Sequence, residues 1–110
     1  MTAKVRSPKL TEADVTKTII DYLRSQHWMC IRHQSGLLVT NDKRRIRVGS
    51  PGAPDWIVFK GPNYCFIEMK APGKVLTTDQ LIWFGLASFN KINCIWCDSF
   101  EMFMEKWKAL

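Results

Sequence analysis

Three ionisable side chains stand at the open end of a predicted β-hairpin, in the stretch PDWIVFKGPNYCFIEMK at residues 54–70. Two strongly apolar runs flank a turn sequence, KGPN, at residues 60–63. With that loop, the antiparallel register sets Asp55 directly opposite Glu68, and the two-residue period of a strand puts Glu68 and Lys70 on one face. A slip by one residue would move Asp55 to the other face. The sequence therefore predicts two carboxylates and an ammonium group at one end of the hairpin.

Two adjacent carboxylates must share a proton, pair with a cation or bind a metal ion. Because only oxygen ligands are present at this end of the hairpin, a hard ion such as Mg²⁺ or Mn²⁺ fits better than zinc. Such an ion polarises a phosphoryl oxygen and activates water, and Lys70 could hold the water or stabilise the developing charge. The competing interpretation is a structural ion cluster. An acid at the start of a predicted helix, Glu12, on the face of its apolar stripe, favours the catalytic interpretation.

The net charge of +6 favours a polyanionic partner such as DNA. Four positive charges fall within five residues, at Lys43, Arg44, Arg45 and Arg47. Such a run is also typical of a solvated loop or ribbon. A membrane surface fits less well, because the run has no amphipathic helix beside it.

The four cysteines offer a second possible site. Cys94 and Cys97 have C-x-x-C spacing, but no second pair or nearby histidine completes four zinc ligands. The other two, Cys30 and Cys65, also have apolar neighbours, which is typical of reduced thiols in a core. We therefore expect free cysteines and no zinc site.

At 110 residues and 12.8 kDa the chain fits a single domain, residues 1–110, of which residues 1–10 are expected to form a flexible basic arm. No apolar run approaches the roughly 20 residues of a membrane span. The first residues also lack the apolar segment of a secretory signal. We therefore expect an intracellular protein that does not enter a membrane.

The pattern of apolar residues predicts an α/β fold, a small mixed sheet flanked by helices. The expected elements are a helix at 12–26, a strand at 28–32, the hairpin, a helix at 78–90, a strand at 92–97 and a last helix after Ser99. The helix at 78–90 is apolar nearly all round, which predicts burial. Residues 33–54 read as a long polar loop with a short ribbon at 37–48, a length that usually signals function. Within it, Gly52 lets backbone or substrate come close.

The ordered motifs of this chain resemble those of one nuclease family. Pro54-Asp55, twelve residues and then Glu68-Met69-Lys70 form the pattern of the PD-(D/E)xK nuclease superfamily. Around it stand, in order, Glu12, Arg32, Gly52-Ala-Pro-Asp55, Phe66-Ile-Glu68-Met-Lys70 and Thr77-Thr-Asp-Gln80. Across residues 11–98 the chain is similar to the VRR-NUC family in its stand-alone minimal form.

The resemblance implies a restriction-endonuclease-like αβββαβ core that cleaves DNA with Mg²⁺ or Mn²⁺. It places Asp55, Glu68, the carbonyl of Met69 and Glu12 at the metal, Lys70 as the catalytic lysine and Gln80 as an orienting residue. Two of these side chains have local alternatives. Glu12 also suits the positive end of a helix dipole, and Gln80 also suits a capping box begun by Thr77.

The resemblance further implies a structure-selective endonuclease acting on branched DNA such as Holliday junctions, in a bacterial or virus-infected cell. Resolving a four-way junction needs two cuts related by a two-fold axis, so we expect a homodimer with both sites on one basic face. Arg32 and His33 are expected to contact phosphate. The five tryptophans lie in apolar settings that favour packing over base stacking. The alternatives are a flap, end or nonspecific DNA nuclease, and a DNA-binding module whose acidic cluster is only structural.

Overall fold

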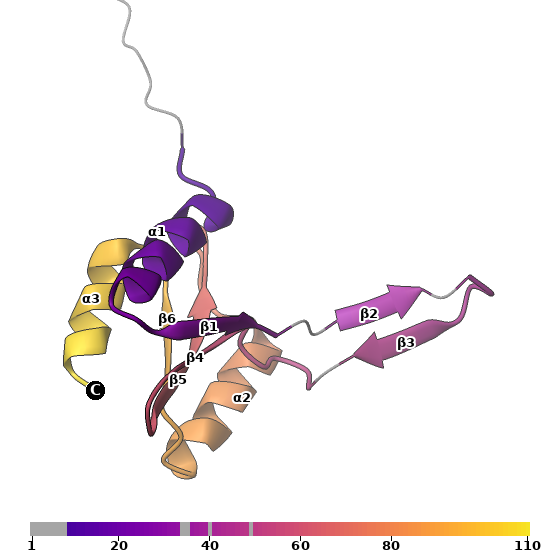
Figure 1. Ribbon diagram of the computed structural model, residues 1–110. Helices are drawn as coiled ribbons and strands as arrows, with labels where there is room; N and C mark the ends of the chain where they lie inside the picture. Colours follow the sequence, from indigo (N-terminus) through magenta and orange to yellow (C-terminus); the bar gives the residue numbers. More distant parts are fainter. Residues whose placement is uncertain (1–8, 34–35, 40, 49) are drawn as a thin grey trace, which may run out of the picture.

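The computed structural model of the chain describes residues 9–33, 36–39, 41–48 and 50–110. For residues 36–39 and 45–48 it describes the backbone but not the side chains. The basic arm predicted at residues 1–10 lies outside the described residues except for Lys9 and Leu10, which are exposed. From Glu12 onward, three helices and a four-stranded sheet form the body of the protein (Figure 1).

The main sheet is mixed, with strand order β1-β4-β5-β6. Its strands are β1 (Met29–Arg32), β4 (Trp56–Lys60), β5 (Asn63–Met69) and β6 (Cys94–Cys97). The first three run antiparallel, and β6 runs parallel to β5. Phe59 pairs with Tyr64 across the β4–β5 hairpin, so the predicted register is confirmed. The coarse prediction of an α/β fold with a small mixed sheet is confirmed as well.

The three helices begin where polar side chains cap them. Thr11 starts α1 (Glu12–Ser25) and Thr77 starts α2 (Thr78–Phe89), each with a capping box, and Ser99 starts α3 (Phe100–Lys108). In Figure 1, α1 and α3 lie on one face of the sheet and α2 lies on the other. Among the helices described, none is long and apolar enough to cross a bilayer.

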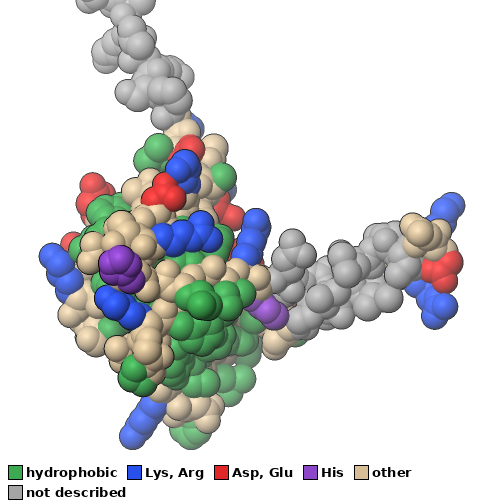
Figure 2. All heavy atoms as spheres, in the orientation of Figure 1, with side chains coloured by type: hydrophobic (Ala, Val, Ile, Leu, Met, Phe, Trp, Pro, Cys, Tyr) green, Lys and Arg blue, Asp and Glu red, His purple; other side chains and the backbone are tan. Residues whose placement is uncertain are grey.

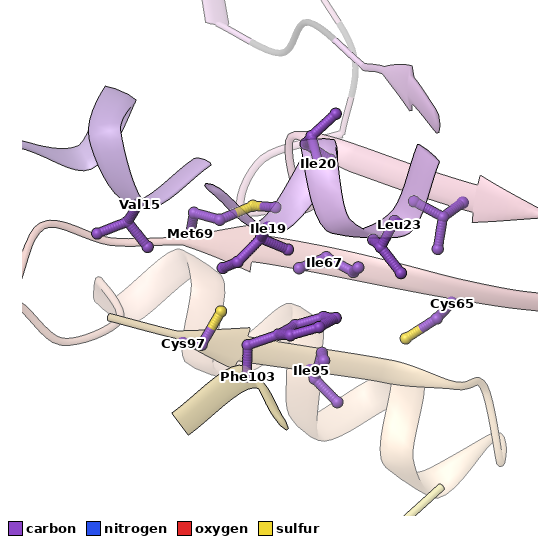
Figure 3. Close-up of a cluster of buried hydrophobic side chains, with 11 residues drawn as sticks. Val15, Ile19, Ile20, Leu23, Cys65, Ile67, Met69, Ile95, Cys97 and Phe103 are labelled. Atoms are coloured by element: carbon purple, nitrogen blue, oxygen red, sulfur yellow. The ribbon is translucent and has the colours of Figure 1, made fainter. Parts of the chain in front are cut away.

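The hydrophobic core lies between the sheet and the pair α1 and α3 (Figure 3). Alternate residues of the strands point into it, because successive side chains of a strand face opposite sides. The core side chains drawn as sticks include Val15, Ile19, Ile20 and Leu23 of α1, Cys65, Ile67 and Met69 of β5, Ile95 and Cys97 of β6, and Phe103 of α3. The apolar pattern of the first helix predicts a stripe of Val15, Ile19, Tyr22 and Leu23, and all four pack in or against this core.

The other face of the sheet is less completely covered, and here one prediction was wrong. The apolar composition of α2 predicted a buried helix, yet Ala87 is its one buried residue. Trp83 packs edge-on against Phe66 of β5, with ring centroids 5.3 Å apart, and holds the helix to the sheet. The opposite side of α2 is exposed, with Phe89 84% exposed. A single helix on a four-stranded sheet can bury only the side that touches the sheet.

A two-stranded antiparallel ribbon, β2 (Gly36–Val39) and β3 (Arg45–Val48), projects from the body (Figure 1). In the described part of the chain, β2 and β3 contact each other and no other helix or strand. The ribbon predicted at residues 37–48 is therefore confirmed, and its turn carries the exposed residues Asp42, Lys43 and Arg44.

Candidate active site

The open end of the β4–β5 hairpin brings Asp55 and Glu68 together. The strand ladder reaches Trp56 opposite Ile67, and Asp55 occupies the next step. The backbone N–H of Asp55 donates a hydrogen bond to Oε1 of Glu68 over 3.2 Å. Glu68 is only 3% exposed, whereas Asp55 is half-buried. The sequence prediction that these two residues are neighbours is confirmed.

The carboxyl group of Glu68 is held in an environment that disfavours its charge. Its pKa is raised from 4.5 to about 7, chiefly by burial and then by the neighbouring carboxylate of Asp55. The ammonium of Lys70 opposes this effect, and the hydrogen bond from Asp55 does so to a smaller extent. Glu12 adds a small further increase. A cation placed between the carboxylates would relieve the repulsion and stabilise the ionised form.

The segment before β4 is tied to the end of β1. The backbone N–H of His33 donates a hydrogen bond to the carbonyl of Asp55, so the antiparallel pairing of the two strands extends past Arg32. The side chains of Arg32 and His33 are exposed. Asp55 is therefore held on one side by β1 and on the other by Glu68.

A pocket of about 290 Å³ opens beside Asp55, between the sheet and α1. Its lining residues are Glu12, Ala13, Thr16, Lys17, Ile20, Asp21 and Arg24 of α1, together with Arg32, Asp55, Trp56 and Met69. It thus gathers four residues named from the sequence, namely Glu12, Arg32, Asp55 and Met69. It also contains two basic residues that sequence reasoning missed, Lys17 and Arg24. Spacing gave no usable signal for Arg24, because a helix turns by about a third of a circle over the twelve residues that separate it from Glu12.

The donor set at this end of the hairpin suits a hard cation. Asp55 and Glu68 supply carboxylate oxygens, and the backbone carbonyl of Met69 follows directly in the chain. Glu12 lines the same pocket from the first turn of α1, where its charge also suits the helix dipole. Within the described residues, no three His, Cys, Asp or Glu side chains lie close enough together to hold a metal ion by themselves. Asp55, Glu68 and the carbonyl of Met69 are thus the groups that could hold a cation here, and Glu12 does not complete a cluster of three carboxylates with the first two.

The loop that leads to Asp55 is packed against the N-terminus of α2. Gly52 has a φ of +78°, and a Cβ built on it would overlap the carbonyl of Asp79 and lie 2.8 Å from the backbone nitrogen of Gln80. The close approach predicted at Gly52 is thus made by backbone, the first turn of α2. Any side chain at this position would push the loop and the helix apart, and Asp55 follows three residues later.

The side chain of Gln80 forms the capping box that the sequence offered as an alternative to a role at the metal site. Its side-chain oxygen accepts a hydrogen bond from the backbone N–H of Thr77 over 2.9 Å, as a capping box requires. Gln80 also adjoins Gly52 through its backbone. In this arrangement it helps to start α2 beside the site, and its side-chain oxygen is directed to the helix cap.

The basic residues of the ribbon lie apart from the hairpin end. Lys43 and Arg44 are exposed at the ribbon turn, and Arg44 pairs with Asp42. Arg45 and Arg47 belong to β3, and their side chains lie outside the described part of the structure. The structure thus places four of the predicted DNA-binding residues on the ribbon and Arg32 in the pocket, whereas His33 is exposed beside Arg32 and is not among the residues that line the pocket.

The cysteines and tryptophans follow the packing interpretation. All four cysteines are free. Cys97 is buried in the core while Cys94 is half-buried, and their odd spacing in β6 directs them to opposite faces of the sheet. Each of the five tryptophans is half-buried. Trp28 and Trp107, for example, pack edge-to-face with ring centroids 4.8 Å apart.

Comparison with known proteins adds no identification. No known protein family, curated protein or solved structure matches the chain.

Proposed function

We propose that the protein is a divalent-metal-dependent endonuclease that hydrolyses phosphodiester bonds of DNA. The observation that carries the proposal is the buried carboxyl of Glu68, packed against Asp55 and influenced by the ammonium of Lys70. Placing a buried carboxylate beside a half-buried one is unfavourable unless a cation lies between them. In a chain with a net charge of +6, that cation would lie next to a bound polyanion. Outside the ribbon the elements run α1-β1-β4-β5-α2-β6-α3, and the first six are consistent with the αβββαβ order implied by the VRR-NUC resemblance.

Asp55, Glu68 and the carbonyl of Met69 are the residues that would hold Mg²⁺ or Mn²⁺. When bound, such an ion polarises the scissile phosphate and lowers the pKa of water. Lys70 lies two residues after Glu68, directly past the end of β5. From there its ammonium can orient the attacking water and stabilise charge that develops on the phosphate. Glu12 can contribute a further carboxylate from the other side of the pocket.

The pocket offers a place for the DNA backbone. Arg24 and Arg32 line it together with Asp55, so a phosphate group beside the carboxylates would meet guanidinium groups. The exposed side chain of His33 follows Arg32 and can add a donor. The basic ribbon would contact DNA farther from the cut.

We further propose that the substrate is branched DNA, such as a Holliday junction, and that the protein acts as a homodimer. Each chain has one pair of carboxylates, whereas junction resolution requires two cuts. A flap, end or nonspecific duplex nuclease would use the same catalytic residues. A DNA-binding module with a structural acid pair is the alternative from a different class.

Cleavage assays with labelled DNA separate these functions. Four-way, flap and linear substrates are incubated with protein in Mg²⁺, Mn²⁺ or EDTA. We expect metal-dependent cuts in the four-way junction, and loss of at least about 10²-fold in rate for Lys70→Ala. Lys74→Ala, an exposed lysine four residues away, is the matched control and should cleave normally.

Two results would exclude parts of the proposal. Cleavage that persists at the parent rate in Lys70→Ala or Glu68→Ala removes the mechanism. Binding of DNA without cleavage in any metal supports the non-catalytic module instead.

A further inference from the structure

The outward face of α2 exposes an unusual amount of apolar surface. Its exposed large side chains are Leu81 at 59%, Ile82 at 58%, Leu86 at 61% and Phe89 at 84%. From Gln80 to Asn90 the sequence contains no charged residue. Contiguous apolar surface of this kind marks an interaction site in most water-soluble domains.

We propose that this face of α2 pairs with the same face of a second copy of the chain, as two antiparallel helices about a two-fold axis. The distribution of charge favours a second copy of the chain as the partner. Two copies with a net charge of +6 repel each other over most of their surfaces, and the uncharged face of α2 is where they can approach at least electrostatic cost. Depletion of charge is also typical of the core of protein interfaces. DNA, by contrast, would find no cation on this face.

The side chains of the face have complementary sizes in such a pair. Ile82, Leu86 and Phe89 are spaced by four and three residues, which places them along one stripe of the helix. Gly85 lies beside the stripe, and apart from its chain neighbours and its own helix backbone no atom of the described residues lies within 4 Å of a Cβ built on it. With the two-fold axis between positions 85 and 86, the partner's Leu86 fills the space over Gly85, and Ile82 faces the partner's Phe89. Large side chains thus meet a small one, as close helix packing requires.

The sheet can extend the interface beyond α2. Cys30 packs toward the core, so its neighbours Met29 and Ile31 point to the α2 side of the sheet, and both are exposed. Figure 2 shows hydrophobic side chains gathered over the region in which β1, β4 and α2 lie. A stable interface buries roughly 800 Å² per partner, more than one helix face supplies, so this additional surface is needed.

The inference rests on the homodimer of the proposed function and adds its interface. Because the helix pair needs neither metal nor DNA, a test in EDTA without DNA is separate from the cleavage assays. The helix pair does bear on the site, because the first turn of α2 touches Gly52 in the loop that leads to Asp55. Each helix of the pair therefore contacts the loop of its own protomer's site.

Sedimentation equilibrium or light scattering over a range of protein concentrations, in EDTA and without DNA, tests the pair. The parent protein should have twice the mass of the 12.8 kDa chain. Leu86→Glu should raise the dimer dissociation constant at least tenfold, because the pair would then bury two negative charges, one from each copy, near its axis. Leu10→Glu is the matched control, since Leu10 is 62% exposed, lies directly before the cap of α1 and not on α2, and its substitution should leave the dimer unchanged.

A second variant tests whether the loss of the dimer in Leu86→Glu is caused by misfolding of the monomer. Gly85→Leu adds a side chain where the single chain has open space, and it replaces a poor helix former, so the monomer should fold at least as well as the parent. The added side chain occupies the position of the partner's Leu86, so the dimer should be weakened at least tenfold. A parent protein that stays monomeric at about 100 μM would overturn the inference. So would dimers of both variants as stable as the parent.

Discussion

Replacing Glu68 by glutamine should make the metal-free protein more stable at alkaline pH. Glutamine has nearly the same shape as a protonated glutamate and can still accept the hydrogen bond from the N–H of Asp55. It removes the one property that the folded state disfavours, the negative charge of a side chain that is 3% exposed beside another carboxylate. The substitution thus isolates the cost of ionising residue 68.

The sign and size of the effect follow from the pKa of Glu68. Its pKa is raised from 4.5 to about 7 in the folded protein, so between these values the folded state keeps a proton that the unfolded state has released. Stability conferred by this proton is fully present below pH 4.5 and is lost as the pH rises toward 7. At about 1.4 kcal/mol for each pKa unit, the parent loses about 3 kcal/mol between pH 4.5 and 8 that Glu68→Gln retains.

Urea unfolding followed by tryptophan fluorescence measures the effect, in EDTA at pH 4.5 and pH 8. The free energy of unfolding of Glu68→Gln minus that of the parent is compared at the two pH values, because this double difference cancels the other titrating groups. Glu105→Gln, a change at an exposed glutamate of α3, is the control for a surface substitution. Equal differences at pH 4.5 and pH 8 would refute the reasoning, since they would mean that the folded protein imposes no cost on the charge of Glu68.

Three other predictions concern the metal, the loop and the ribbon. Mg²⁺ or Mn²⁺ at about 100 times its dissociation constant should stabilise the parent by about 2.7 kcal/mol at pH 8. Thermal unfolding of Asp55→Asn should show little of this gain, and an undiminished gain would place the metal elsewhere. Gly52→Ala should lower the free energy of unfolding by about 1–3 kcal/mol more than Gly73→Ala does. Both glycines have a positive φ, but a Cβ at Gly52 also meets the backbone of α2. Equal losses for the two variants in urea titrations would contradict that contact. Alanine at all four basic ribbon residues should weaken DNA binding and reduce the slope of log affinity against log salt, measured by fluorescence anisotropy, and an unchanged slope would show that the ribbon does not touch phosphate. Those four residues are Lys43, Arg44, Arg45 and Arg47.

Much of the site was predictable because it depends on local rules. A short turn and the two-residue period of strands set the register of the β4–β5 hairpin, and that register alone puts Asp55 beside Glu68. The capping side chains Thr11, Thr77 and Ser99 set the beginnings of the helices in the same way. Each of these features involves residues close together in the chain, so the sequence carries the whole of the physical cause.

Other features required the tertiary structure. The composition of α2 predicted burial, but what a helix buries depends on how much surface its neighbours offer, and among the described residues one side of α2 is left exposed. Arg24 joins Arg32 and Asp55 in one pocket only because α1 packs on the sheet against β1 and β5. The raised pKa of Glu68 likewise arises from burial. These properties come from contacts between distant segments, and no local period or spacing encodes the shape of the space between them.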